Sequence, residues 1–357
     1  MIGARFFVPL LIPKFPLPAI IACLVLDAAD QSIFQRMGYD PPGYQSYDKA
    51  MDVWYLAVAW LSTLRNWSSL AAFKVSRFLY FYRLVGVVAF ELTGVRPLLL
   101  IFPNTFEYFF IAYEAIRSRW RTVRWQLRWW VGVAAFIWIF IKLPQEWWIH
   151  VAQLDFTDAL ENNPWFGPLI VVVALAAGGA FWIWGRPRLL PADHAFRLAA
   201  DPLPREMDSA DKQILEYAEQ GSIWSTATLE KVMLLGLLSV IFSQTLPGVR
   251  SSNIELFIGV AGVVVINAAV TLALYRRQVS AASTALAFTA RMVGNIVLVA
   301  LATWLLPLGE DGEINVFATL YFLTMISLLT TFHDRWSPIY RSRVAAAEAT
   351  AETSPAP

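Results

Sequence analysis

The sequence predicts an all-α fold, a polytopic integral membrane bundle of about ten transmembrane helices. Of the 357 residues, 57% are hydrophobic and only 15% are charged, whereas a soluble domain carries about 25% charged residues. The mean hydropathy of +0.51 agrees with this composition. The apolar residues also come in blocks of about 20, the length of helix that crosses a bilayer core of about 30 Å.

Ten apolar blocks define the predicted spans, taken here in chain order. The first, 6–27, is interrupted by Pro13, Lys14, Pro16 and Pro18, so we expect a broken or partly interfacial helix. The other nine blocks are less interrupted, and they cover 50–66, 70–94, 97–116, 129–150, 165–185, 228–247, 254–275, 285–307 and 314–333. The tight turn TGVRP joins spans three and four, and Pro144 predicts a kink in span five.

The loops between these spans alternate in charge, and this alternation orients the bundle. Residues 117–128 contain five arginines and no acid, whereas residues 151–164 contain three acids and no Lys or Arg. Basic residues return in 186–212 and in 335–343, with an acidic loop at 310–313 between them. Because basic loops stay on the cytoplasmic side, the pattern predicts that both termini are cytoplasmic and that the number of spans is even.

Composition also divides the chain into regions. Spans one to five are rich in aromatic and charged residues, whereas spans six to ten are rich in Ala, Val, Leu and Gly. The predicted regions are an N-terminal membrane half (1–185), a cytoplasmic loop with short amphipathic helices (186–226), a C-terminal membrane half (227–334) and a disordered cytoplasmic tail (335–357).

Charged residues within spans three, four and five define the candidate site. A charge at mid-bilayer costs at least about 2.5–3.5 kcal/mol, so such residues face the bundle interior or a water-filled cavity. In the hairpin of spans three and four, Arg83 lies twelve residues before Val95 and Glu107 lies twelve after it. Residues equidistant from the turn share one depth, and we therefore predict an Arg83–Glu107 ion pair near the midplane.

Polar faces on the neighbouring helices extend this pair into a predicted pocket. On span four, Asn104 and Glu107 share one helical face, and on span five Lys142 and Glu146 share another. Glu91 approaches the same zone from the outer end of span three. We expect an outward-facing, substrate-binding pocket made by Arg83, Glu91, Asn104, Glu107, Lys142 and Glu146. Glu114 is expected instead to form a surface ion pair with Arg117 at the inner interface.

These features favour a transporter or permease for a small polar solute in the plasma membrane. They are mid-depth charges, a proline-interrupted span beside them and the lack of a large soluble domain. An integral membrane enzyme acting on a lipid-linked substrate remains an alternative, with Glu91 or Glu107 as acid or base and Asp27 and Asp30 as electrostatic or metal-binding partners. A non-enzymatic scaffold, in which the polar network is structural, is the third hypothesis.

Motifs of known chemistry give little support to an enzyme. The sequence contains no nucleotide-binding glycine loop, no HExxH and no GxSxG. We therefore expect no catalytic residue, no cofactor and no metal site. The basic segment 117–128 adjoins a span, which favours contact with anionic lipids over nucleic acid. The expected partners are the lipid bilayer and the solute, and the single Cys23 excludes an intrachain disulfide.

Overall fold

The computed structural model describes residues 2–36, 44–152, 162–245, 253–276, 284–305 and 316–353. Over these residues the fold is all-α, without strands. The first half contains α1 (Ile2–Phe7), α2 (Pro16–Arg36), α3 (Tyr44–Asn66), α4 (Leu70–Thr93), α5 (Pro97–Ile101), α6 (Thr105–Arg117), α7 (Leu127–Phe136), α8 (Leu143–Glu146) and α10 (Phe166–Ala180). The second half contains α11 (Ala210–Gln220), α12 (Thr226–Thr245), α13 (Asn253–Arg276), α14 (Thr284–Leu305) and α15 (Val316–Thr353).

Shorter helical segments connect or extend these helices. Three-residue and four-residue 3₁₀ turns occur at Val8–Leu11, Thr122–Arg124, Arg186–Arg188 and Arg205–Met207. Wider π-helical segments occur at Ile137–Lys142, Trp147–Val151 and Phe181–Gly185. The first π segment joins α7 to α8, and the second extends α8, so that the three form one long helix.

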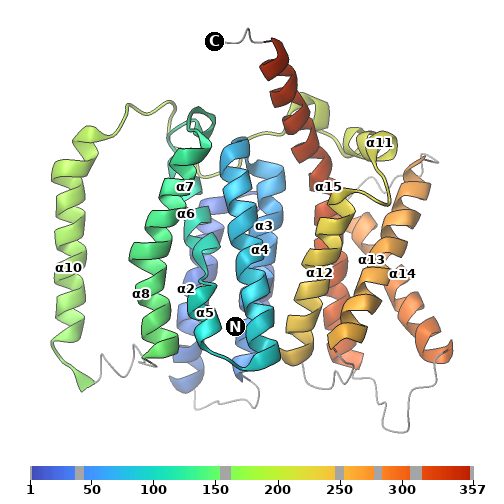
Figure 1. Cartoon of the computed structure of the whole chain (residues 1–357), viewed down its shortest axis with the longest axis horizontal. Helices are drawn as coiled ribbons and strands as arrows, with labels where there is room; N and C mark the ends of the chain where they lie inside the picture. The colour runs from blue at the N-terminus through green and yellow to red at the C-terminus, as the bar shows by residue number, and fades with distance from the viewer. Residues whose placement is uncertain are drawn as a thin grey trace.

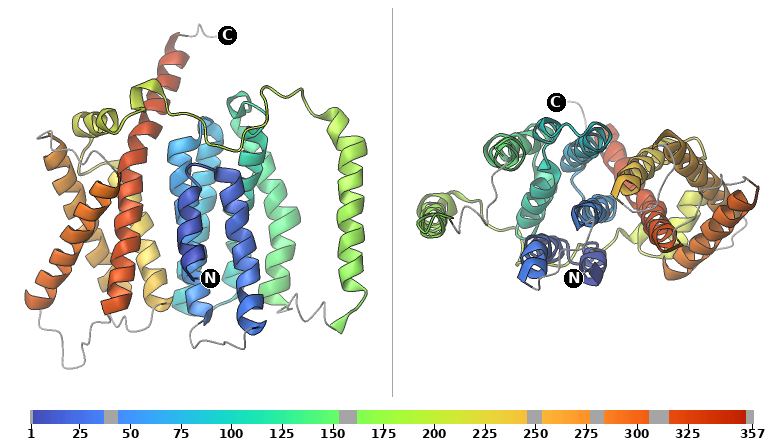
Figure 2. Two further views of the ribbon diagram at one scale, coloured as in Figure 1. Left: turned by 180° about the vertical axis from the view of Figure 1, so that it is seen from behind. Right: turned by 90° about the horizontal axis from the view of Figure 1, so that it is seen from below.

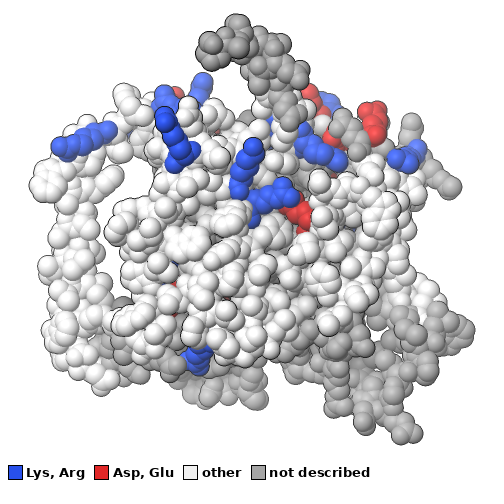
Figure 3. All heavy atoms as spheres, viewed as in Figure 1, with Lys and Arg blue, Asp and Glu red and all other residues white. Residues whose placement is uncertain are grey.

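The long helices run side by side between two ends of the molecule (Figures 1 and 2). In the described part of the chain, three helical stretches are long and apolar enough to cross a membrane: Leu127–Ile149, Phe166–Arg188 and Leu256–Ala273. On the face drawn in Figure 3, Lys and Arg side chains gather toward the end of the molecule that carries α11. The chain therefore combines membrane-compatible helices with basic side chains that gather at one end of this face.

Aromatic packing positions α3, α4 and α6 against one another. Trp60 on α3 stacks on Tyr80 of α4, with ring centroids 5.4 Å apart, and Trp67 stacks on Tyr113 of α6 at 3.7 Å. All four side chains are buried. α12 and α15 pack against α4 and α3 from the other side, which joins the two halves of the chain.

The N-terminal segment differs from the predicted first span, 6–27. Arg5 lies 2.8 Å from Asp52 in the first half of α3, whereas the carbonyl of Pro13 accepts a hydrogen bond from Arg65 near the end of α3. The residues before the turn therefore run alongside α3 in the same direction, and α2 then returns. Prolines, which lack a backbone donor, interrupt the helix at this turn.

This reversal contradicts the prediction that both termini lie on one side. α1 begins within the bundle, toward the end opposite to the C-terminal part of α15 (Figures 1 and 2). The predicted even number of spans rests on treating the segment before the turn and α2 as one span. Because these two segments form a hairpin, that assumption does not hold.

The C-terminal tail also differs from the prediction of disorder over 335–357. α15 continues to Thr353, and residues 354–357 lie outside the described part of the chain. Arg343 anchors the extension by donating to the backbone carbonyls of Arg65 and Trp67, at 2.6 and 3.0 Å. Alanine is the strongest helix former, so an Ala-rich segment continues a helix that is already nucleated and anchored.

Candidate functional site

A cavity of about 460 Å³, here called the outer pocket, lies between α3, α4, α5, α6 and the end of the α7–α8 helix. Its polar lining consists of Asp52, Arg83, Glu91 and Asn104. Aromatic and aliphatic side chains complete the wall, among them Tyr80, Leu99 and Phe106. Three residues predicted for substrate binding, Arg83, Glu91 and Asn104, are thus brought to one cavity.

The pocket is shaped by a break in the predicted span 97–116. α5 ends at Ile101 and α6 begins at Thr105, and the ψ angles of Phe102 and Asn104, 64° and 63°, are not helical. Pro103 between them has no backbone N–H to donate, which favours interruption of the helix here. The stretch predicted as one helix is therefore two, joined by three non-helical residues at the pocket.

Side chains from neighbouring helices satisfy the backbone groups that the break exposes. Arg83 Nη1 donates to the carbonyl of Phe102 at 2.9 Å, and the hydroxyl of Tyr82 donates to the carbonyl of Ile101 at 2.9 Å. The backbone N–H of Asn104 donates to Glu146 Oε1 at 3.1 Å. Irregular backbone at membrane depth requires such partners, and here the polar residues of α4 and α8 provide them.

A glycine permits the close approach of this break to α4. A Cβ atom added at Gly86 would lie 2.1 Å from Cβ of Phe102, far inside van der Waals contact. Gly86 thus allows Phe102 to pack directly on the α4 backbone. The second required glycine, Gly94, ends α4 with a left-handed φ of 69° and its N–H bonded to the carbonyl of Phe90.

The predicted Arg83–Glu107 ion pair is not formed. Arg83 binds the carbonyl of Phe102 instead, and Glu107 accepts hydrogen bonds from the hydroxyl of Tyr55 at 2.5 Å and from Asn104 Nδ2 at 2.9 Å. Equal-depth counting assumed an unbroken helix from the turn to Glu107. The break instead places Glu107 in the first turn of α6, with its carboxylate bonded to α3.

Glu107, Lys142 and Glu146 form a separate group, here called the buried charged cluster. Their exposed fractions are 4%, 3% and 4%. Lys142 Nζ lies 3.8 Å from Glu146 Oε1 and 4.5 Å from the ring centroid of Tyr108, and it donates to Gln145 at 2.9 Å. None of the three is among the residues that line the outer pocket, although the sequence predicts them in its walls or floor.

Asn104 connects the outer pocket to the buried charged cluster. Its side chain lines the pocket while its backbone N–H and its Nδ2 bind Glu146 and Glu107. Its Oδ1 atom and the hydroxyl of Tyr80, both buried at the pocket, have no hydrogen-bond partner among the described residues. Buried polar atoms are nearly always paired, and these two are the unpaired buried side-chain oxygens among the residues that line the pocket.

The position of Lys142 and Glu146 depends on the π-helical segments of span five. The segments Ile137–Lys142 and Trp147–Val151 flank α8, which contains Pro144. Instead of a single break at the proline, the helix widens on both sides of it. π-Helical turns are rare and are frequent at functional sites, and these two place both charged side chains toward α5 and α6.

Two residues of this region, Arg5 and Asp52, were not identified from the sequence. Arg5 binds Asp27 at 2.5 Å and Asp52 at 2.8 Å, which joins α1, α2 and α3. Asp27, the proposed partner of an enzymatic carboxylate, is therefore held by Arg5, and the side chain of Asp30 lies outside the described residues. An arginine directly before the first apolar block and an aspartate at the start of the second were the available signals.

The Glu114–Arg117 ion pair forms as predicted, with Nε and Oε2 2.6 Å apart, but it is buried. Glu114 has no exposed surface and also accepts a hydrogen bond from Nε1 of Trp67 at 2.8 Å. Arg117 reaches onward to Asp201 at 3.2 Å and to the carbonyl of Ala199 at 3.1 Å. The pair thus links α6 to the segment that follows α10.

Several ionisable and polar groups line the outer pocket. It offers one guanidinium group, two carboxylates and an amide oxygen, and in the described residues no group of three or more His, Cys, Asp or Glu side chains is placed to hold a metal ion. Comparisons of the chain with models of known families, with curated proteins and with solved structures find no match.

Proposed function

We propose that the protein is a multi-pass transporter or permease of the plasma membrane that binds a small polar solute in the outer pocket. In this proposal about ten helices cross the bilayer, and the arginine-rich segments and the end of α15 face the cytoplasm. The observation that carries the proposal is the break at Phe102–Asn104, of which Asn104 lines a cavity of about 460 Å³ together with Arg83 and Glu91.

The size and lining of the outer pocket support a small-molecule ligand. Binding cavities for such ligands measure about 300–1,000 Å³ and combine an apolar wall with a few polar groups. Secondary transporters often bind their substrates where a helix is interrupted near the middle of the membrane. The outer pocket has this size and adjoins an interrupted helix.

The polar groups indicate which solutes the pocket suits. A guanidinium group has five N–H donors, and Arg83 uses one of its nitrogens on the carbonyl of Phe102. Its remaining donors suit a carboxylate or phosphate group of the solute. Asn104 Oδ1 suits a hydroxyl or amino group on the same molecule. The carboxylates of Asp52 and Glu91 also line the pocket, so the proposed solute class is small molecules that carry both a carboxylate or phosphate group and an amino or hydroxyl donor.

Binding is tested first, on the full chain purified in detergent. A panel of small hydroxy acids, amino acids and sugar phosphates is screened for an increase in melting temperature, with wild type and Arg83→Ala side by side. The proposal predicts that at least one compound stabilises wild type and has a weaker effect on Arg83→Ala. Arg96→Ala, at the turn before α5 and outside the pocket lining, is the matched control and should behave like wild type.

Transport is then measured with the radiolabelled compound that stabilises best. Proteoliposomes should accumulate it faster with wild type than with Arg83→Ala, in proportion to the binding loss. Binding without flux would argue against a transporter and for an enzyme or receptor at the same pocket. Absence of any stabilising compound, together with loss of accumulation of Arg83→Ala, would favour the structural scaffold.

A further inference from the structure

A second polar centre lies in the other half of the molecule, where α12, α14 and α15 meet. Lys231 on α12 and Arg291 on α14 both form ion pairs with Asp334 on α15, the latter at 2.6 Å. The three side chains are 7% exposed or less. Two cations thus share one carboxylate away from water, which leaves one positive charge without a counterpart.

The charges next to this centre do not supply the missing negative charge. Arg341 is paired with Glu216 at 2.9 Å, and Arg77 is paired with Glu230 at 2.7 Å. Each of these pairs is balanced within itself. A buried charge without compensation costs several kcal/mol, so a further negative group is expected at the centre.

Hydrogen-bond donors point to the place where that group lies. A lysine ammonium has three donors, but in the described part of the chain Lys231 Nζ bonds only to Asp334. Nδ1 of His333, Oγ of Ser337 and Nε of Arg341 are buried and have no hydrogen-bond partner among the described residues. Lys231, His333 and Ser337 have exposed fractions of 1%, 1% and 4%.

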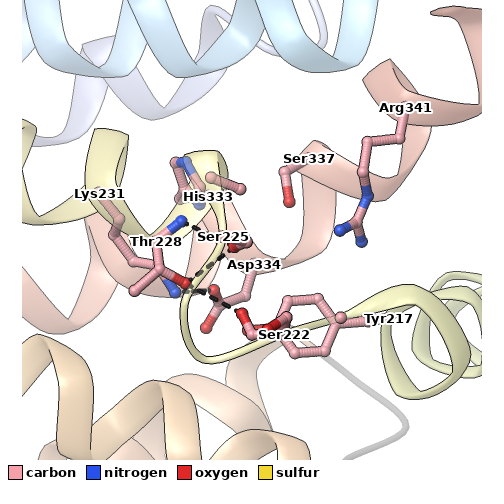
Figure 4. A pocket seen from close by; sticks show the side chains of 11 residues that line it. Tyr217, Ser222, Ser225, Thr228, Lys231, His333, Asp334, Ser337 and Arg341 are labelled. Atoms are coloured by element: carbon pink, nitrogen blue, oxygen red, sulfur yellow. Dashed lines mark hydrogen bonds and ion pairs between the residues drawn. The ribbon is translucent and has the colours of Figure 1, made fainter.

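All of these groups line one small cavity of about 10 Å³ (Figure 4). Ser225, Ala227 and Thr228, at the start of the 20-residue helix α12, also line it. The N–H of Thr228 is capped by Oγ of Ser225 at 3.2 Å, but the helix N-terminus still carries a partial positive charge, which favours an anion. The cavity therefore combines a helix N-terminus, an uncompensated cation and unpartnered buried side chains.

We infer that this cavity is a binding site for a single monatomic anion, of which chloride is the abundant example. The excess positive charge selects an anion over water. The volume is near the lower limit for one particle of the size of water. It therefore favours a monatomic anion over phosphate, sulfate and organic anions, and the lining side chains must move slightly to admit chloride. The bound anion would complete the charge balance between α12, α14 and α15 and so stabilise the C-terminal half. This site stands apart from the outer pocket, and its existence does not depend on transport.

Thermal unfolding of the full chain in detergent tests this inference. Sodium chloride replaces sodium gluconate stepwise at constant ionic strength, which keeps general screening unchanged. The melting temperature should rise with chloride and then saturate, as for a ligand that binds only the folded state. Equal melting temperatures in chloride and gluconate would mean that the cavity contains water only, and would overturn the inference.

Two variants locate the effect. Ser337→Ala removes a hydroxyl from the cavity and should raise the apparent Kd for chloride about tenfold, the effect of one hydrogen bond to a charged group. Ser327→Ala is the matched control, because Ser327 is also buried on α15 but bonds to Asn295 and does not line the cavity. An unchanged chloride Kd in Ser337→Ala would place the anion elsewhere.

A measurement on the wild-type chain provides an independent check, should a variant fail to accumulate. Crystals grown in sodium bromide should give an anomalous difference peak within hydrogen-bonding distance of Lys231 Nζ and Ser337 Oγ. No peak at the cavity would contradict the inference, whatever the melting curves show.

Discussion

The hydroxyl of Tyr55 lies 2.5 Å from Oε1 of Glu107, and both side chains are buried. This contact joins α3 to the first turn of α6, directly behind the break that lines the outer pocket. The other carboxylate oxygen of Glu107 accepts a hydrogen bond from Asn104 Nδ2. Tyr55 therefore holds the carboxylate of Glu107, and this carboxylate in turn holds the side chain of Asn104, a pocket residue.

A double-mutant cycle measures this relationship. Tyr55→Phe removes the donor to a charged group and should lower the free energy of unfolding by about 1.5–3 kcal/mol. Glu107→Gln should also destabilise, and the double variant should lose less than the sum, with a coupling above about 0.5 kcal/mol. Denaturant titration in mixed micelles gives the four unfolding free energies.

The comparison pair for this cycle is Arg83→Met with Glu107→Gln. These residues share no ion pair or hydrogen bond, so their coupling should be clearly smaller than that of Tyr55 and Glu107. If the Arg83 coupling proves the larger, the predicted ion pair is correct after all and the break at Phe102–Asn104 is misplaced.

Gly86→Ala tests the close contact between α4 and the break. The added methyl group meets Phe102 at 2.1 Å, so Phe102 and the pocket backbone must move. We expect a loss of about 1–3 kcal/mol in the unfolding free energy, typical of overpacking. The unfolding curve of the purified variant provides the value.

Gly132→Ala is the matched control for Gly86→Ala. It places the same methyl group on another helix, α7, where nothing lies within 4 Å. Its helix propensity should make it neutral or stabilising by up to about 1 kcal/mol. Equal effects at the two glycines would mean that Phe102 does not pack on α4 as described.

Arg117→Ala should be among the most destabilising changes at the end of α6. It leaves the buried carboxylate of Glu114 without its ionic partner, at a cost of about 3–5 kcal/mol. Arg119→Ala, two residues away and exposed, should change stability by less than about 0.5 kcal/mol. Accumulation in the membrane and melting temperature compare the two. Similar values for both variants would show that Glu114 is solvated at the surface, as the sequence first indicated.

The sequence predicted the long helices well, because hydropathy and helix signals act locally. The predicted span 70–94 coincides with α4, Leu70–Thr93, whose end is marked by Gly94. The interruption at Phe102–Asn104 was missed although Pro103 stood in the stretch. An apolar block of about 20 residues has the same hydropathy whether or not its helix is continuous. Hydropathy indicates burial in lipid and carries no information about backbone geometry.

The site was predicted by residue type but only partly by arrangement. Arg83, Glu91 and Asn104 line the outer pocket, while Glu107 and Lys142 lie buried behind it. Which side of a helix faces a cavity depends on how the helices pack together. Counting residues outward from a single turn gives their depth but no information about this packing. The Lys231–Asp334–Arg291 centre was missed for the same reason, because its three helices are distant in sequence.

The most direct test of the central claim is aqueous access to the outer pocket in intact cells. In a Cys23→Ala background, single cysteines are placed at Glu91, Asn104, Glu107 and Lys142, and a membrane-impermeant thiol reagent is added from outside. The structure and the proposed orientation predict that the cysteines at 91 and 104 react, and that those at 107 and 142, buried to 4% and 3% exposure in the native side chains, remain unlabelled. Protection of all four in folded protein would mean a dry, packed network, and it would contradict a solute-binding pocket.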